Sequence, residues 1–213
     1  METVNTGQMI DGVGPESGIR VSGARVVPAH RSRWLSLALV AALAVVFAIA
    51  RPQPVLAEPT EQEVKAALIF NITRFVEWPA TGFDSPGAPL VIAIMGRDGV
   101  SDVLVPMLLG KSVNGRDVDV RHVRTIEEAR KCHVLYVAGS EKRRAAATLK
   151  AMGNASTLTV SDIDHFAERG GHINLVLEDQ RVHVIVNLTS VTGCHLKISA
   201  KLLSLAEIVG GPS

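Results

Sequence analysis

Charge of one sign is not concentrated anywhere in this sequence. Its 213 residues contain 22 Lys and Arg against 21 Asp and Glu, which gives a formal net charge of +1. A basic stripe or tail is the usual sequence signature of a nucleic-acid-binding protein. The even distribution of charge therefore argues against nucleic acid as a partner.

Aromatic residues and cysteines are also scarce. Aromatic residues make up 4% of the chain, and the two cysteines are Cys132 and Cys194. Hydrophobic residues nevertheless make up 47%, and the length is sufficient for one well-packed core.

Long apolar runs are limited to residues 34–50. Arg31 and Arg33 precede this run, and small residues follow it in the sequence VLA up to Ala57. A positive segment, a short apolar stretch and small residues at the cut are typical of a secretory signal. We therefore interpret residues 1–57 as a signal peptide with a long N-terminal extension, and residues 58–213 as the exported domain.

Two other readings of the N-terminal segment stay open. The peptidase could cut after Ala50, and the run is just long enough to act as an uncleaved membrane anchor. Met9 is an alternative start of translation.

From Glu58 onwards the chain has 17 basic and 18 acidic residues, a net charge near −1. Every reading predicts that the rest of the chain is exported.

The rest of the chain alternates apolar runs with helical patterns, which predicts an α/β domain with a mainly parallel sheet. The tail predicts an antiparallel hairpin and a final packing helix. The expected helices cover 61–78, 98–110, 125–132, 140–153, 163–171 and the second half of 190–210; the expected strands cover 90–96, 118–122, 133–139, 156–162 and 172–188, the last two-stranded around 178–180.

The first of these helices is apolar around most of its circumference. Such a width predicts burial on more than one side. We expect it to pack against the sheet on one side, and against the last helix or a second subunit on the other.

Two glycine motifs resemble nucleotide-binding loops only in part. Gly110-Lys111-Ser112 matches the end of a P-loop, but Val105 stands where that motif needs a glycine. Gly96 and Gly99 lack the third glycine of a dinucleotide fingerprint. We expect no bound cofactor and interpret the second motif as a tight turn.

The histidines and hydroxyls do not predict a catalytic or metal site. The six histidines of the exported part show no ligand spacing, so no metal is expected. Ser161, Asp162 and His165 are close in sequence, but a triad needs groups that converge from separate elements. A serine at a strand end is more often a cap, so nothing in these residues calls for an enzyme, although they leave one open.

The cysteines allow two alternatives. A bridge between Cys132 and Cys194 would close a loop of about 62 residues, worth roughly 4 kcal/mol in the chain-entropy model. Since both neighbourhoods are apolar, two buried thiols are equally compatible with the sequence.

Several segments together resemble the YfiR-like family of periplasmic proteins, over about residues 61–209. They include VKAALIFNITRFVEWP, KCHVLYVAGS and the VSD, GG and VN positions of residues 157–188. The resemblance assigns structural roles to five residues of these motifs, Trp78, Pro79, Gly170, Gly171 and Asn187. It also implies a homodimer.

The family resemblance implies that the protein has no enzymatic activity and that its function is carried by a surface. Its best-known role is to bind the periplasmic region of a membrane-bound diguanylate cyclase and repress it, which lowers cyclic-di-GMP and biofilm formation. An outer-membrane lipoprotein is a further implied partner.

Family members often pair the cysteine of the CH motif with one in the first strand, where this chain has Ala93. The alternative function is a sensing module for a histidine kinase or an outer-membrane receptor.

Overall fold

The structure, a computed structural model, describes residues 37–43 and 58–210. Residues 37–43 are helical and belong to a first unit, Met1–Leu56, whereas Ala57–Ser213 form a second unit. Apart from 37–43, the predicted signal peptide and its two cleavage points lie outside the described residues. Among the residues described, no helix combines the length and the apolar character needed to cross a membrane.

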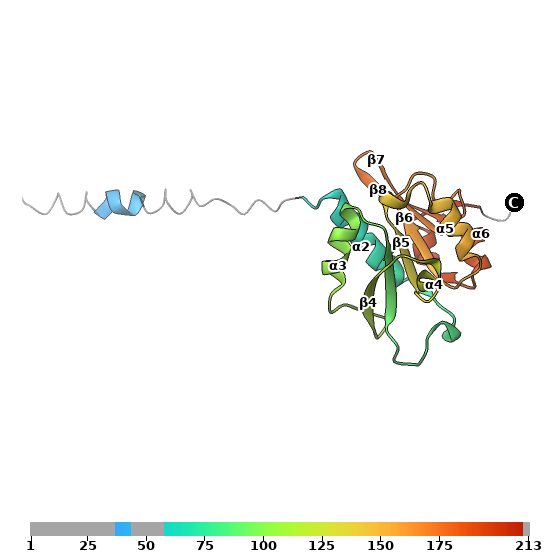
Figure 1. Cartoon of the computed structure of the whole chain (residues 1–213). Helices are drawn as coiled ribbons and strands as arrows, with labels where there is room; N and C mark the ends of the chain where they lie inside the picture. Colours follow the sequence, from blue (N-terminus) through green and yellow to red (C-terminus); the bar gives the residue numbers. More distant parts are fainter. Residues whose placement is uncertain (1–36, 44–57, 211–213) are drawn as a thin grey trace, which may run out of the picture. The chain divides into compact units, whose positions relative to one another are not determined.

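A mainly parallel sheet forms the centre of the second unit (Figure 1). The pairs β7–β8 and β3–β4 are antiparallel, and the other neighbours are parallel. This arrangement confirms the α/β class and the C-terminal hairpin. In spatial order, the eight strands of the described part are β10 (Glu207–Val209), β8 (Arg181–Asn187), β7 (Ile173–Glu178), β6 (Leu158–Ser161), β5 (Val134–Val137), β2 (Leu90–Met95), β4 (Arg116–Val123) and β3 (Ser112–Val113).

Helices cover both faces of this sheet and enclose two hydrophobic clusters. One face carries α2 (Glu61–Thr73), α3 (Gly99–Leu108), α6 (Leu188–Gly193) and α7 (Ala200–Leu203). The opposite face carries α4 (Ile126–Ala129) and α5 (Ala145–Met152). Two 3₁₀ turns, Ala80–Gly82 and Gly139–Glu141, and a two-stranded sheet of β1 (Val76–Glu77) with β9 (Lys197–Ile198) complete the unit.

Local sequence explains where several elements begin. Thr60 starts α2 with a capping box: its Oγ1 accepts from the Glu63 amide at 3.3 Å, and Glu63 Oε2 accepts from the Thr60 amide at 2.8 Å. Thr125 and Glu128 repeat this arrangement at α4, as predicted. All six residues of β2 are buried, which explains its uninterrupted apolar run.

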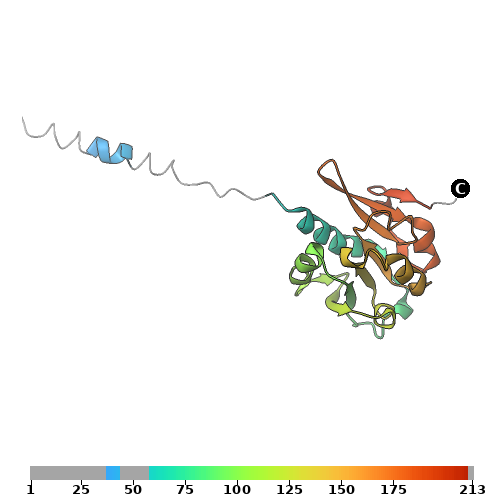
Figure 2. The ribbon, with the colours of Figure 1, turned by 45° about the horizontal axis from the view of Figure 1, so that its top comes forward.

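The final packing helix was predicted too long. Only Ala200–Leu203 are helical there, and Glu207–Val209 instead form β10, which pairs with β8 through Ile208 and Val186. Ser199 Oγ caps the start of the helix by accepting from the Leu202 amide, and the Ser204 amide donates back to Ala200 O at its end. Figure 2 shows the long β7–β8 hairpin, orange-red, with this last strand beside it.

Three other predicted boundaries are wrong. The first helix ends at Thr73, since the chain then becomes extended and Val76–Glu77 pair with β9. The helix expected from Ser140 starts at Ala145, and Ser140 Oγ accepts instead from the Arg97 amide at 2.9 Å. Residues 163–171 form turns and no helix, because Asn174 Oδ1 accepts from the Phe166 amide at 2.9 Å.

The apolar first helix, α2, is covered on several sides. Ala66, Ile69 and Ile72 are buried in the cluster over the sheet. α2 also lies against α3 (Figure 1), and beyond its C-terminal end Phe75 O accepts from the Ser199 amide at 2.9 Å. The expected packing against the sheet is therefore present, but the helix that lies along α2 is α3 and not the last helix.

Candidate functional site

Trp78 and Pro79 hold the loop that leads into the sheet. Trp78 Nε1 donates to His133 O at 3.0 Å, and the two rings meet edge-on. Pro79 is the cap residue of the 3₁₀ turn that follows. The aromatic residue of this loop, Phe83, stacks on His133 with ring centroids 4.2 Å apart.

His133 is the anchor of that loop. Its Nδ1 accepts from the Val91 amide at 2.9 Å, so its proton lies on Nε2, which is 3.1 Å from Gly82 O. Burial, more than any other cause, lowers the pKa of His133 and keeps the ring neutral. A neutral ring can both accept and donate here, which fixes the loop against β2.

Gly171 and Asn187 build the turn before β7 and the start of α6. A Cβ at Gly171 would overlap the ring of Phe166 and lie 2.7 Å from its carbonyl oxygen, while Gly170 has φ of +97°. Asn187 Nδ2 donates to Ala167 O at 2.8 Å, and its Oδ1 accepts from the Ser190 amide at 2.9 Å. These motif residues thus act through the backbone geometry that they fix.

Cys132 and Cys194 are both buried, free thiols. They belong to the two hydrophobic clusters on opposite faces of the sheet. Ala93 lies in the same cluster as Cys132. The geometry therefore supports the second alternative, two buried thiols. Burial raises the pKa of both sulfur groups, which makes them weak nucleophiles.

The three residues considered as a triad have separate partners. Ser161 Oγ donates to Val137 O at 2.7 Å and accepts from the Ile163 amide at 3.1 Å. Asp162 binds Lys65, and His165 Nδ1 lies 3.3 Å from Glu168 Oε1. Within the described residues, no group of three or more His, Cys, Asp or Glu side chains is arranged to hold a metal ion.

A network of charged residues around a tyrosine, at the carboxyl ends of β2, β5 and β6, was not predicted from the sequence. The hydroxyl of Tyr136, a buried residue, donates to Asp98 Oδ2 at 2.9 Å and lies 3.3 Å from Asp162 Oδ1. Lys65, from α2, completes it with Nζ 2.9 Å from Asp162 Oδ2. Asp98 and Asp162 each follow a buried strand, and parallel strands end at the same edge of a sheet. This pattern in the sequence could have predicted that the two carboxylates lie close together.

A cleft of about 710 Å³ lies at the carboxyl ends of β2 and β4, and none of the four residues of the network lines it. We call it the β2–β4 cleft. Its lining combines apolar side chains with a group of arginines; it consists of Met95, Gly96, Arg97, His122, Val123, Arg124, Ile126, Glu141, Arg144, Ala147, Thr148 and Ala151.

The fold and these contacts define an α/β domain whose motif residues position loops around a central sheet. The model of the YfiR/HmsC-like family matches residues 62–207, and the chain belongs to this family. At the level of the family, membership implies a periplasmic regulator of diguanylate cyclase. A comparison with curated proteins gives no match.

Two solved structures show limited similarity. A conserved domain protein from Vibrio cholerae is 14% identical with a TM-score of 0.49, covering 71% of this chain and 60% of that protein. An ABC domain in complex with L-Trp from Streptococcus pneumoniae is 11% identical with a TM-score of 0.46, covering 68% and 59% respectively. This chain thus spans less than two thirds of either structure.

Proposed function

We propose that this protein is a non-enzymatic periplasmic regulator that binds the periplasmic region of a membrane-bound diguanylate cyclase and represses it. The observation that carries the proposal is the family match, which covers residues 62–207 and thus nearly the whole second unit. Repression lowers cyclic-di-GMP and with it biofilm formation.

The positions of the motif residues support a function carried by surface contacts. Gly171 and Asn187 are buried, and the indole of Trp78 bonds to the backbone of a neighbouring strand. These residues stabilise the scaffold, so recognition of a partner falls to the exposed residues around it. Interfaces need complementary shape and charge but no fixed chemistry, which leaves them free to differ between relatives.

Export of the chain is part of the proposal. The segment 1–57 carries it across the membrane, and cleavage after Ala57 releases a domain that starts at Glu58. A β-lactamase fused after residue 213 is expected to protect cells from ampicillin only when 1–57 is present. Mass spectrometry of the purified protein is expected to find Glu58 as the first residue.

Gene deletion followed by restoration tests the regulator directly. Deletion is expected to raise intracellular cyclic-di-GMP, and the complete gene is expected to restore the original level. A gene lacking residues 2–57 provides the control, since its product stays in the cytoplasm and is expected not to restore it. Unchanged cyclic-di-GMP after deletion would refute the proposal and favour a histidine kinase or an outer-membrane receptor as partner.

Partner and oligomeric state need their own measurements. The proposal expects the cyclase to copurify with the exported protein from detergent-solubilised membranes, and an outer-membrane lipoprotein to compete with it. Sedimentation of the purified protein is expected to show a homodimer. Sedimentation as a monomer at micromolar concentration would remove the dimer from the proposal without affecting the regulator.

A further inference from the structure

The geometry points to a binding site for a small organic dianion with an apolar body, located in the β2–β4 cleft. This ligand site goes beyond the proposed repression of a cyclase, which requires only protein contacts. The topology of the sheet, the composition of the cleft and its charge support it independently.

The cleft lies where two neighbouring strands lead to helices on opposite faces of the sheet. β2 leads into α3 on one face, whereas β4 leads into α4 on the opposite face. β2 and β4 are parallel neighbours, so the loops after them diverge at the same edge. In open α/β sheets, ligands bind at such points outside the carboxyl ends of the strands.

The floor of the cleft is apolar and shielded from solvent. Met95 is 5% exposed and Val123 is 6% exposed, and both line the cleft at the ends of their strands. Ala147 and Ala151 face it from one side of α5. Small side chains on that helix leave room for a ring or a short aliphatic body, within the volume range of ligand pockets.

The rim of the cleft is cationic. The cleft is lined by three guanidinium groups, those of Arg97, Arg124 and Arg144, and by one carboxylate, that of Glu141; these four groups together carry a formal charge of +2. The exported part of the chain as a whole has a net charge near −1. The positive charge is therefore a local property of this cleft.

Two of the three arginines are available for a ligand. Arg144 already binds Glu141, with Nε 3.0 Å from Oε2 and Nη2 3.0 Å from Oε1. Among the residues that the structure describes, the side chains of Arg97 and Arg124 make no hydrogen bond or ion pair. Their guanidinium groups can each bind an oxyanion through two parallel hydrogen bonds.

Gly96 brings the arginine-bearing loop to the cleft. Its φ of +87° is the left-handed conformation, and a Cβ there would lie 2.5 Å from Ser140 Oγ. The loop after β2 is thereby packed against the loop after β5, and the Arg97 amide donates to Ser140 Oγ at 2.9 Å. This contact fixes the backbone of Arg97 on the rim.

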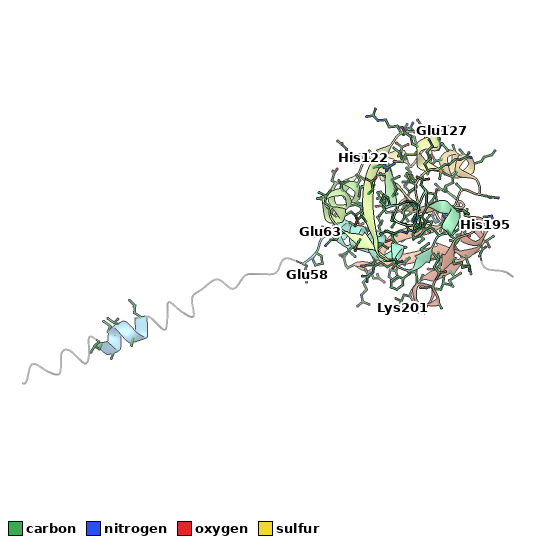
Figure 3. The ribbon with its side chains drawn as sticks, turned by 90° about the horizontal axis from the view of Figure 1, so that it is seen from below. Glu58, Glu63, His122, Glu127, His195 and Lys201 are labelled. Carbon is green, nitrogen blue, oxygen red and sulfur yellow. The ribbon has the colours of Figure 1, made fainter. Side chains whose placement is uncertain are left out.

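His122, which lines the cleft, lies apart from Lys201 of α7 in Figure 3. His122 lies on the same side of the domain as Glu127, away from Lys201. A ligand at His122 therefore does not occupy the surface around Lys201. Binding at one side could accompany a protein partner at the other.

Phenyl phosphate is the probe, since it combines a dianionic phosphate with a ring. Inorganic phosphate has only the charge and phenol only the ring, so both are expected to bind more weakly. Phthalate carries two carboxylates on the same ring. Its affinity relative to phenyl phosphate identifies whether the site prefers a dicarboxylate or a phosphate ester.

The measurement uses protein expressed with its complete N-terminal segment and purified as it is processed by the cell. Calorimetric titration gives the affinity, and amide chemical shifts locate the site. Shifts are expected at 95–97, 122–126 and 141–151. Absence of binding at millimolar phenyl phosphate, or shifts scattered over the whole surface, would overturn the site.

Substitution of the rim arginines tests whether they bind the phosphate group. Arg124→Gln and Arg97→Gln are each expected to weaken phenyl phosphate about tenfold, and Arg124→Lys less, since it keeps the charge but loses the planar fork. Arg143→Gln is the matched control because this exposed neighbour of Arg144 does not line the cleft. An equal loss in Arg143→Gln would show general charge attraction and overturn the proposal. Neither result bears on cyclase repression, which is measured in cells.

Discussion

Lys65 Nζ lies 2.9 Å from Asp162 Oδ2 and joins the first helix of the domain to the loop after β6. The Lys65 side chain is 8% exposed and that of Asp162 is 20% exposed. Burial alone would lower the pKa of Lys65, but its bonds to Glu61 and Asp162 outweigh this effect and raise that pKa. The Lys65 amine therefore stays charged and binds the carboxylates of Glu61 and Asp162.

Removal of this amine should destabilise the domain. Lys65→Met keeps the apolar stem but leaves Asp162 without its cation, so we expect a loss of about 2 kcal/mol in the free energy of unfolding. Lys142→Met provides the control: Lys142 Nζ is 2.7 Å from Asp164 Oδ2, but both side chains are more than half exposed. Its cost is expected to be below about 0.5 kcal/mol. Urea denaturation measures both, and equal losses would contradict the role of burial.

His172 should make the stability of the domain depend on pH. Burial, the main cause, lowers the pKa of His172 from 6.5 to about 4. In the unfolded chain the ring takes up a proton near pH 6.5, whereas in the folded chain it does so only near pH 4. Stability is therefore complete above pH 6.5 and decreases by about 3 kcal/mol as the pH falls to 4.

The carboxylates of the domain also titrate in this pH range. Comparing wild type with a His172 variant separates the contribution of His172 from theirs. His172→Gln offers an oxygen in place of Nδ1, which accepts from the Thr159 amide at 3.0 Å. The stability difference between wild type and His172→Gln should shrink by about 3 kcal/mol between pH 7 and pH 4. His195→Gln, at an exposed position, is the control variant. A constant difference for His172→Gln would exclude the histidine as the source.

Gly171 should not tolerate a side chain. Gly171→Ala places a methyl group into the ring and the carbonyl oxygen of Phe166, which is 1% exposed, so we expect a loss of about 3 kcal/mol. In Gly193→Ala the new methyl has no neighbour within 4 Å and lies in α6, where alanine favours the helix. Thermal unfolding should therefore show a lower Tm for the first variant and an unchanged or higher Tm for the second.

The two cysteines should titrate as thiols. With a chromogenic disulfide reagent, the native protein is expected to react slowly because both sulfur atoms are buried and their pKa values are raised. In denaturant, without reductant, two thiols per chain should react. A count of zero would establish a bridge between Cys132 and Cys194 and contradict the arrangement on opposite faces.

The sequence predicted the elements whose causes are local. Runs such as residues 90–95 are apolar without interruption because both faces of the strand are covered. The turn Asp179–Gln180 has positive φ at both residues and closes the predicted hairpin. Thr125 and Glu128 cap a helix through contacts only three positions apart. In each case the residues that determine the structure are neighbours along the chain.

Elements that depend on distant partners were predicted incorrectly or missed. The leucines and isoleucines after Leu196 have a helical period, yet Ile208 pairs with Val186 in a strand. Nothing around Ile208 identifies that partner. The β2–β4 cleft was missed for the same reason, since Arg97, Arg124 and Arg144 meet only after the strands are placed in order. The tight turn at Gly96 was recognised, but its contact with Ser140 was not.

The pairing of β1 with β9 constrains the order in which the domain can be completed. Val76, at the start of the domain, pairs with Ile198, near its end. A chain threaded through a membrane N-terminus first presents Val76 long before Ile198 has crossed. In the export that we propose, Val76 and the apolar helix before it therefore stay without this partner strand until Ile198 has crossed.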